Sequence, residues 1–490
     1  MSRKAPWWVA LVPLTVLVSL LIISIKIYAA DALYGASQLC LLIAAAISVL
    51  IGMVFYRIKW KDYEEAISTN VKNVTQALLI ILIIGSLSSM WIVSGVVPTM
   101  IYYGMQLLHP NFFLLSTCLI TILVSVTTGS SWATIATVGL ALMGIGISHG
   151  FSEGWIAGAI ISGAYFGDKI SPLSDTTVLA SSMVGINIMK HIRYMLITTL
   201  PAIIITLVIF TIAGLSHNTA DGSHVESFTN ALNDRFNISP WLLIVPIVTG
   251  VMIARRMSSI ITLFLSSVLA GVFAVIFQCD ALREIATHTS YGAMQVVEGI
   301  MTTLFTSTSL HSDTPIIEEL ISTRGMEGML PTMWLIICAM TFGGAMSASG
   351  LISSLMSSLK GKNRRPLGIV SSTVGAGLSL NMITGDQYIS IILTGQTFLP
   401  LYKKAGYEER LLSRTTEDAV TVTSVLIPWN SCGMTHSTVL GVSTLTYLPY
   451  CFFNILSPVM SLAVAAIGYK IFRKKENEVP VIETEHIKEQ

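Results

Sequence analysis

The chain has 490 residues, of which 53% are hydrophobic and only 11% are charged, and its formal net charge is +1. Because about a quarter of the residues in a typical soluble protein are charged, this composition excludes a soluble globular protein and indicates a protein embedded in lipid. The nearly neutral balance gives no reason to expect a nucleic-acid partner. The six cysteines are scattered without metal-ligand spacing, and we interpret them as core residues rather than disulfide partners or zinc ligands.

Eight apolar runs are predicted to span the membrane, since a helix needs about 20 apolar residues to cross the hydrocarbon. They are Trp7–Tyr28, Leu33–Phe55, Val74–Thr99, Ile192–Leu215, Trp241–Ala254, Ser259–Gln278, Pro331–Leu355 and Leu448–Ile471. The first run is longer than the apolar region of a secretory signal peptide, so we interpret it as the first span. Residues 279–330 are mixed in polarity and are predicted to be an external or shallow segment, with two further crossings as the alternative.

Four other stretches are apolar but interrupted by glycine, proline and polar residues, namely 111–148, 155–190, 366–400 and 411–446. Clusters of Lys and Arg flank 366–400 on both sides, and such clusters favour the cytoplasmic face. This stretch is therefore predicted to be a re-entrant hairpin that enters from the cytoplasm. The stretch 111–148 has no Lys or Arg nearby and is predicted to enter from outside. The result is ten crossings, two opposed hairpins and two cytoplasmic termini.

The two interrupted regions align without a gap when the sequence is shifted by 256 residues. The matches are mainly helix breakers: Pro110, Gly129, Gly139 and Pro172 meet Pro366, Gly385, Gly395 and Pro428. Paired, interrupted segments in inverted halves indicate the binding site of a transporter. We therefore predict an all-α polytopic membrane protein with two inverted repeats, each with a re-entrant hairpin and a broken transmembrane helix. Residues 1–236 form the first half, 237–472 the second half and 473–490 a cytoplasmic tail.

The interruptions carry the oxygen ligands that a small hard cation prefers, from carboxylates, hydroxyls and unwound backbone. The residues predicted to bind ions or protons are Asp168, Asp175, Asp418, Thr128, Gly129, Ser130, Ser171, Thr176, Thr384, Gly385, Asp386, Asn430 and Ser431. Among them, Asp175, Asp418, Thr128 and Thr384 are predicted sodium ligands. Burial disfavours the charged form of a carboxylate, so a sodium ion and a proton can compete for one site.

Structural roles are open for the same side chains. Asp168 can pair with Lys169 or with another nearby cation. Asp175 and Asp386 can cap helices, and Glu417 and Asp418 can lie in a solvated turn near the interface. The hydroxyl groups at the hairpin tips can simply satisfy nearby backbone groups.

The sequence contains no nucleotide-binding, metalloprotease or serine-hydrolase motif, so we expect neither an enzyme nor a cofactor. The only expected small-molecule partners are sodium ions and protons, together with the lipid bilayer. Among the histidines, only His436 lies in a broken span, and it is the one to test as a proton carrier.

The run Gly163–Thr177 resembles the hallmark of the NhaC family of sodium/proton antiporters. The runs Thr128–Trp132, Ser413–Asp418 and Ile427–Gly433 resemble other parts of this family, and the similarity extends from Leu33 to Ile471. The resemblance implies alternating-access exchange of cytoplasmic sodium for external protons in a bacterial inner (cell) membrane, an elevator-like mechanism and a homodimer. One branch of the family resembles malate/lactate exchangers coupled to sodium and protons, so a carboxylate cargo is the alternative.

Overall fold

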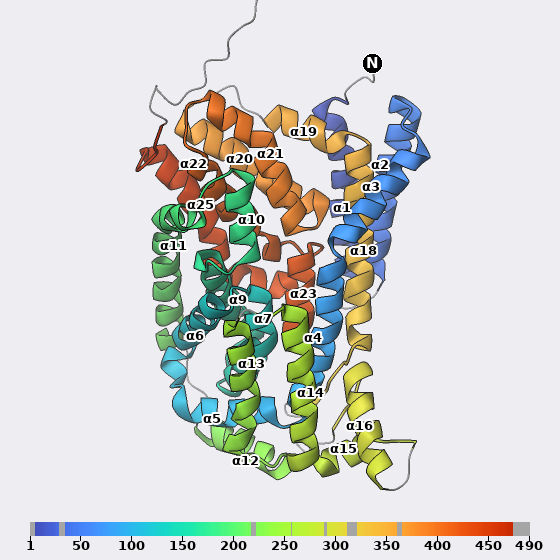
Figure 1. Ribbon diagram of the computed structural model, residues 1–490, viewed down its shortest axis with the longest axis vertical. Helices are drawn as coiled ribbons and strands as arrows, with labels where there is room; N and C mark the ends of the chain where they lie inside the picture. The colour runs from blue at the N-terminus through green and yellow to red at the C-terminus, as the bar shows by residue number, and fades with distance from the viewer. Residues whose placement is uncertain are drawn as a thin grey trace, which may run out of the picture.

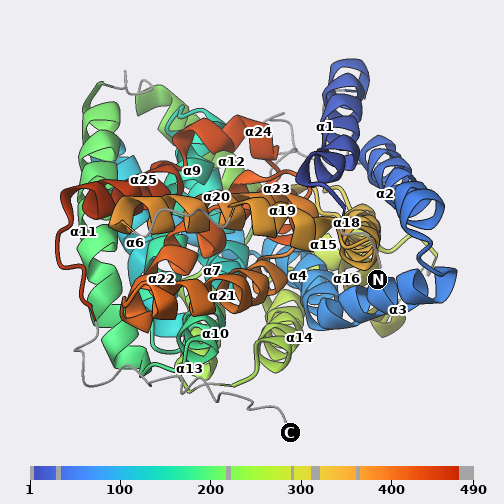
Figure 2. The same cartoon turned by 90° about the horizontal axis from the view of Figure 1, so that it is seen from above.

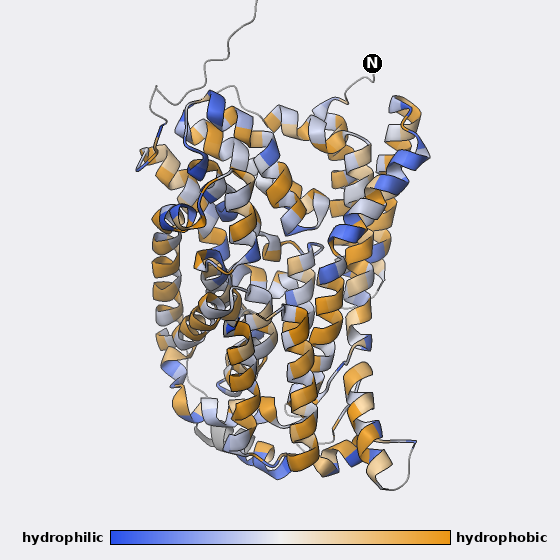
Figure 3. Cartoon of the chain, in the orientation of Figure 1, coloured by the Kyte–Doolittle hydropathy of each residue, from blue (hydrophilic) through white to orange (hydrophobic). Residues whose placement is uncertain are grey.

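The computed structural model describes residues 5–28, 35–216, 222–255, 257–288, 292–310, 321–359 and 365–473, and these ranges fold almost entirely into helices. Apolar residues dominate the middle of the molecule and polar residues gather toward its two ends (Figure 3). Among the described residues, nine helices are long and apolar enough to cross a membrane, or up to eleven if each of two bent pairs is one span. The chain is a multi-pass membrane protein, as the composition predicts.

One group of helices lies on the side of the molecule that carries the N-terminus (Figures 1 and 2). It comprises α1 (Trp7–Tyr28), α2 (Ala36–Tyr56), α3 (Trp60–Asn73), α4 (Thr75–Val93), α14 (Ser259–Phe277), α16 (Ala293–Phe305), α18 (Leu330–Ala348) and α19 (Leu351–Leu359). Within the group, α18 packs against α2 and α3, while α4 packs against α14 and α16. This group forms one wall of the site described below.

The remaining helices of the N-terminal half are α5 (Val96–Leu107), α6 (Phe113–Thr128), α7 (Ser131–Thr134), the π-helical segment η3 (Ile135–Gly139), α8 (Leu140–Ser148), α9 (Glu153–Ile170), α10 (Asp175–Met183), α11 (Ile188–Ser216) and α12 (Gly222–Arg235). The predicted hairpin 111–148 consists of α6 and the α7–η3–α8 arm, which meet at a tight turn. The predicted broken span 155–190 consists of α9 and α10, which are separated by four non-helical residues. Helices α6 and α9 pack closely against each other.

The C-terminal half contains α13 (Ile244–Ala254), α15 (Cys279–Ile285), α20 (Pro366–Thr384), α21 (Gln387–Lys404), α22 (Glu409–Thr416), the π-helical segment η6 (Glu417–Thr421), η7 (Ser424–Leu426), α23 (Ser431–Leu440), α24 (Thr444–Tyr447) and α25 (Phe452–Ile467). The predicted hairpin 366–400 consists of α20 and α21, which pack against each other. The predicted broken span 411–446 winds through α22, η6, η7 and α23.

Several boundaries differ from the predicted ones. The predicted span Val74–Thr99 is two helices: α4 ends at Val93, and α5 begins after Gly95, which adopts a left-handed conformation. The described helices of 279–330 have 7 and 13 residues, too short for the crossings considered as an alternative. Residues 474–490 of the predicted tail lie outside the described residues. Five of the six cysteines are buried, as expected of core residues, whereas Cys279 is half-buried.

Candidate functional site

The first hairpin tip is a short turn between α6 and α7. Gly129 adopts φ +66°, a left-handed conformation that glycine takes without steric cost. A Cβ at this position would lie 2.6 Å from Leu173 Cβ, so the tip packs directly on the break in the next span. Ser130 begins the next helix because its side-chain oxygen accepts a hydrogen bond from Ala133 N at 3.2 Å. The Thr128 hydroxyl donates to the Ser130 carbonyl at 3.3 Å.

The second hairpin tip has the same construction. Gly385 also adopts φ +66°, and Asp386 caps α21 because its Oδ1 accepts from Ile389 N at 2.9 Å. The Thr384 hydroxyl donates to the Asp386 carbonyl oxygen at 3.0 Å. The helix-capping role considered for Asp386 is therefore confirmed, and its second carboxylate oxygen accepts from the Ser431 hydroxyl at 3.2 Å.

Each tip is joined to its broken span by contacts that recur 256 residues later. In the first copy, Ser125 Oγ donates to Ala164 O at 2.6 Å and Ser131 contacts Asp168; in the second, Asn381 Nδ2 donates to Val420 O at 2.7 Å and Ser424 contacts Gln387. These paired contacts agree with the sequence repeat. The opposite orientation of the two copies in a membrane stays a prediction.

Asp168 lies in the last turn of α9, just before the break, and its side chain is buried. Its Oδ2 accepts two hydrogen bonds from Ser131, one from the backbone N at 3.0 Å and one from Oγ at 2.7 Å. The alternative in which Asp168 pairs with Lys169 is wrong, because Lys169 pairs with a different carboxylate. Ser171, in the break, donates to Val126 O at 2.8 Å and so anchors the break to the first hairpin.

Asp175 is the first residue of α10 but not its cap. The cap is Ser174, whose side-chain oxygen accepts from Thr177 N at 3.4 Å and which also contacts the hydroxyl of Thr176 at 3.0 Å. Within the described part of the chain, the Asp175 carboxylate receives no hydrogen bond, and the residue is exposed. Asp175 is thus a carboxylate that a cation can reach without displacing a protein partner.

A cavity of about 540 Å³ brings three carboxylates together, and we call it the acidic cavity. Asp168 and Asp175 line it from the first broken span, and Asp386 lines it from the second hairpin tip. Its lining also includes Gly129, Ser130, Trp132, Thr176, Gln387 and Tyr388. An adjoining cavity of about 430 Å³ shares Asp175 and Ser130 and adds Thr128. Residues of α4 and α14, among them Gln76 and Ser259, close the opposite wall.

Asp418 lies elsewhere, in η6 of the second broken span. Its Oδ1 pairs with the Lys169 ammonium, and Ser457 bridges the two, 3.0 Å from Lys169 Nζ and 3.1 Å from Asp418 Oδ1. Asp418 is not among the residues that line the acidic cavity. Asp418 and the neighbouring Glu417 are fully buried, so the alternative that placed them in a solvated turn is wrong.

Asn430 and Ser431 hold the second tip in place from the start of α23. Asn430 caps this helix by accepting from Cys432 N at 3.1 Å, and its Nδ2 donates to Asn381 O at 3.2 Å. The backbone N of Ser431 donates to Gly385 O at 2.7 Å. Both residues therefore act on the acidic cavity through the hairpin tip that they support.

Sequence reasoning did not select Ser131, Gln76 or Ser259 as site residues. Ser131 belongs to the hydroxyl-rich tip, and a lone amide such as Gln76 near the start of an apolar run was an available signal. His436, selected as a possible proton carrier to test, is fully buried, with Nε2 3.1 Å from the Tyr165 hydroxyl and its ring against Trp132. It is absent from the lining of the acidic cavity.

Comparison with known proteins shows the family of this chain. A model described as "Na+/H+ antiporter family" matches residues 7–184 and 163–469. The Na(+)/H(+) antiporter NhaC of Alkalihalophilus pseudofirmus is 32% identical over 475 residues, which cover 97% of this chain and 98% of the relative. The Na(+)/H(+) antiporter NhaC of Bacillus subtilis is 33% identical, with coverage of 84% and 89%. The malate-2H(+)/Na(+)-lactate antiporter of Bacillus subtilis is 34% identical, with coverage of 90% and 92%. The chain belongs to the Na+/H+ antiporter family, among its NhaC-type members.

Proposed function

We propose that this protein exchanges cytoplasmic sodium for external protons by alternating access across a bacterial cell membrane, with both termini in the cytoplasm. The observation that carries the proposal is the meeting of Asp168, Asp175 and Asp386 in one cavity between two hairpin tips and a broken span. Two relatives that align with most of the chain are named Na(+)/H(+) antiporter NhaC, which supports the same cargo.

The acidic cavity has the chemistry of a sodium site. Sodium is a hard cation that prefers oxygen ligands, and the cavity offers carboxylates together with hydroxyl and amide oxygens. Asp175 is the residue we assign as the primary ligand, since its carboxylate has no hydrogen-bond partner among the described residues. Ser131 fixes the orientation of Asp168, and Ser431 fixes that of Asp386, so sodium meets an arranged set of oxygens.

Coupling follows from competition for the same carboxylates. Several negative charges in one partly desolvated cavity repel one another, so the site gains from binding either a cation or a proton. Closing an unpaired, charged carboxylate away from water costs several kcal/mol. The site therefore changes sides when it carries sodium or protons and not when it is empty, which makes the fluxes of the two ions obligatorily linked. This scheme needs no cofactor.

Reconstituted vesicles provide the direct test. The purified protein is placed in liposomes that contain a pH-sensitive dye, and sodium, lithium, potassium and malate are added in turn. We expect a sodium-dependent proton flux that potassium does not support. No proton movement on addition of sodium, with protein correctly inserted, would refute sodium/proton exchange.

Carboxylate exchange is the second candidate, favoured by the 34% identity to the malate-2H(+)/Na(+)-lactate antiporter. Uptake of labelled malate into lactate-loaded vesicles separates it from sodium/proton exchange. Malate uptake that requires sodium, with no proton flux when malate and lactate are both absent, would favour this candidate.

A further inference from the structure

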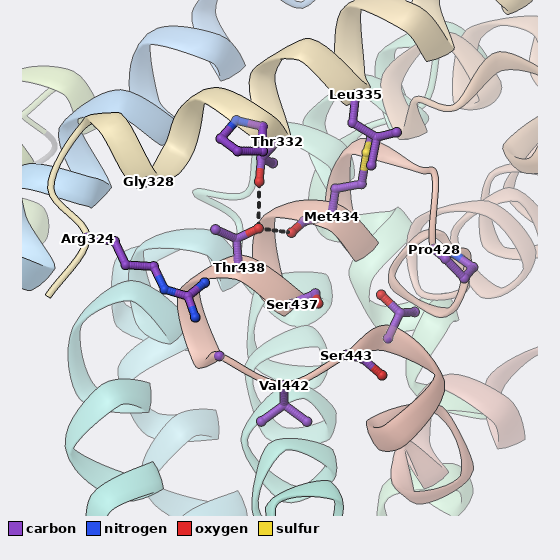
Figure 4. A pocket seen from close by; sticks show the side chains of 13 residues that line it. Arg324, Gly328, Thr332, Leu335, Pro428, Met434, Ser437, Thr438, Val442 and Ser443 are labelled. Carbon is purple, nitrogen blue, oxygen red and sulfur yellow. Dashed lines mark hydrogen bonds between the residues drawn. The ribbon is translucent and has the colours of Figure 1, made fainter. Parts of the chain in front are cut away.

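A third cavity, of about 220 Å³, lies between the start of α18 and α23 (Figure 4). We call it the hydroxyl cavity, because its lining carries the hydroxyl groups of Thr332, Ser437, Thr438, Ser443 and Thr444. Arg324 is the single charged residue in this lining. Because the hydroxyl cavity contains no carboxylate, it suits the passage of an ion better than its retention.

The hydroxyl cavity lies beside the second broken span, and the acidic cavity and its neighbour lie beside the first. Corresponding residues of the two repeats line these spaces. Pro172, in the first break, lines the cavity that adjoins the acidic cavity, and Pro428, 256 residues later, lines the hydroxyl cavity. Gln76 on α4 and Thr332 on α18 are separated by the same interval and also line these respective cavities. The two spaces are thus built from corresponding parts of the repeat.

The elements beside the two spaces extend toward different ends of the molecule. Asn73, at the junction of α3 and α4, lines the acidic cavity, and α3 lies toward the end that carries the N-terminus (Figure 1). Arg324 precedes α18 on the segment that comes from α16, and α16 lies at the opposite end (Figure 1). A route through both cavities would therefore run between elements that extend toward opposite ends of the molecule.

Helix α23 contacts both regions. Its first residue, Ser431, contacts Asp386 in the acidic cavity, while Met434, Ser437 and Thr438 line the hydroxyl cavity. At 1.5 Å per residue, the seven helical steps from Ser431 to Thr438 span about 10 Å. This length is roughly two helical turns, short enough for a modest shift of α23 to open a path between the cavities.

A side-chain hydrogen bond joins α23 to α18 at the hydroxyl cavity. The Thr332 and Thr438 hydroxyl oxygens lie 2.6 Å apart, and Thr438 also donates to the Met434 carbonyl oxygen at 2.9 Å (Figure 4). Thr332 belongs to the helix that packs against α2 and α3, whereas Thr438 belongs to the helix that supports the second tip. The contact therefore joins the wall of the site to the part that holds the ion-binding carboxylates.

We propose that the hydroxyl cavity is the passage by which the ion bound in the acidic cavity reaches the opposite membrane face, and that the Thr332–Thr438 contact closes this passage. This inference rests on the proposed exchange function and names a second site for it. It requires α23 to move away from α18 once in every transport cycle.

Reversible cross-linking tests the proposal. In a chain whose six natural cysteines are replaced, Thr332→Cys and Thr438→Cys are introduced together, because the 2.6 Å separation of the two oxygens suits a disulfide. The matched control is Ser48→Cys with Ser349→Cys. The hydroxyl oxygens of Ser48 and Ser349 lie 3.2 Å apart, and this pair joins the end of α18 to α2 within one helix group. Exchange is measured in vesicles after oxidation and again after reduction, and mass spectrometry reports the disulfide.

We expect oxidation of the Thr332/Thr438 pair to reduce exchange at least tenfold, reduction to restore it, and the control pair to exchange equally in both states. An oxidised Thr332/Thr438 pair that exchanges as fast as its reduced form would overturn the proposal. If the reduced, cysteine-replaced parent and the natural chain both fail to exchange, the proposed function fails instead, so the two failures are distinguishable.

A second measurement does not depend on the paired variant being functional. Ser437→Cys alone, in the same background, is exposed to a membrane-impermeant thiol reagent from each face of oriented vesicles. We expect labelling from the face opposite the termini. Labelling only from the face that carries the termini would contradict the proposal. A thiol that reacts after denaturation but is labelled from neither face would contradict it as well.

Discussion

The Lys169 ammonium forms an ion pair with the Asp418 carboxylate, although 249 residues separate them in the sequence, and both side chains have no solvent exposure. Lys169 lies in the last turn of α9 and Asp418 in η6, so the pair links the two interrupted segments. Ser457 of α25 contacts both charges. Removing one member of such a pair leaves an uncompensated charge in a medium that solvates it poorly.

Lys169→Met should therefore destabilise the protein by about 3–5 kcal/mol, whereas the double variant Lys169→Met/Asp418→Leu should recover much of this loss. The midpoint of thermal unfolding in detergent measures both effects. A single variant that unfolds at the temperature of the natural protein would show that the pair does not stabilise the fold. Sodium-dependent exchange by the stable double variant would further show that Asp418 is dispensable as a sodium ligand.

Asp175→Asn should abolish sodium/proton exchange and leave the protein folded in membranes. The carboxylate lines the acidic cavity and, among the described residues, has no hydrogen-bond partner, so its loss removes the ion ligand without breaking a structural contact. Dye-loaded vesicles measure the exchange. Asp280→Asn, which changes a carboxylate with 97% side-chain exposure, is the matched control and should retain full activity. Normal sodium-dependent proton flux through Asp175→Asn would remove this residue from the site.

Ser131→Ala should weaken sodium binding about tenfold and should do so most at low pH. The substitution removes the 2.7 Å hydrogen bond to Asp168, and a hydrogen bond to a charged group is worth about 1.5–3 kcal/mol. Without it the ionised carboxylate is less stable, so protons compete better and sodium worse. Sodium titrations of exchange at two pH values measure this shift, with Ser148→Ala, whose hydroxyl donates to Ile145 O, as the control. An equal effect at both pH values would contradict competition at Asp168.

The sequence was sufficient to select the three carboxylates that line the acidic cavity, because they lie at local interruptions of apolar runs. Gly129, Gly385 and Asp386 occupy turns whose chemistry is visible within a few residues. Membrane burial makes each carboxylate in such a run costly, so Asp168 and Asp175 were visible for the same reason.

The partner of Lys169 was not predictable in this way. A π-helical turn contains one residue more than an α-helical turn allows, and η6 places such a turn at Glu417–Thr421. The 3.6-residue periodicity therefore does not assign a face to Asp418, and its pairing depends on the packing of α9, η6 and α25. The recurring contacts at the two tips, by contrast, agree with the repeat that the sequence shows.

Gly129→Ala should reduce exchange at least tenfold because it combines two effects. An alanine in the left-handed conformation costs roughly 1–2 kcal/mol, and its Cβ would press on Leu173 at 2.6 Å, moving the tip away from the break. Gly406→Ala is the matched control, since Gly406 has φ +76° and open space around the added carbon. Vesicle exchange and thermal unfolding, measured together, separate the effects. If both variants lost stability equally and both kept exchange, the close contact between the tip and the break would be unimportant.

Arg324→Gln should increase sodium flux through the hydroxyl cavity by about twofold at low ionic strength, with little change near 0.15 M salt. Two like unit charges about 8 Å apart in water repel each other by roughly 0.5 kcal/mol, and the Debye length shortens from about 30 Å at 0.01 M to about 8 Å at 0.15 M. Initial exchange rates at several choline chloride concentrations measure the effect. Arg283→Gln, which neutralises another exposed arginine, is the control. A rate difference that persists unchanged at high salt would contradict an electrostatic action of Arg324 on the ion, and no difference at low salt would place the route of the ion away from this residue.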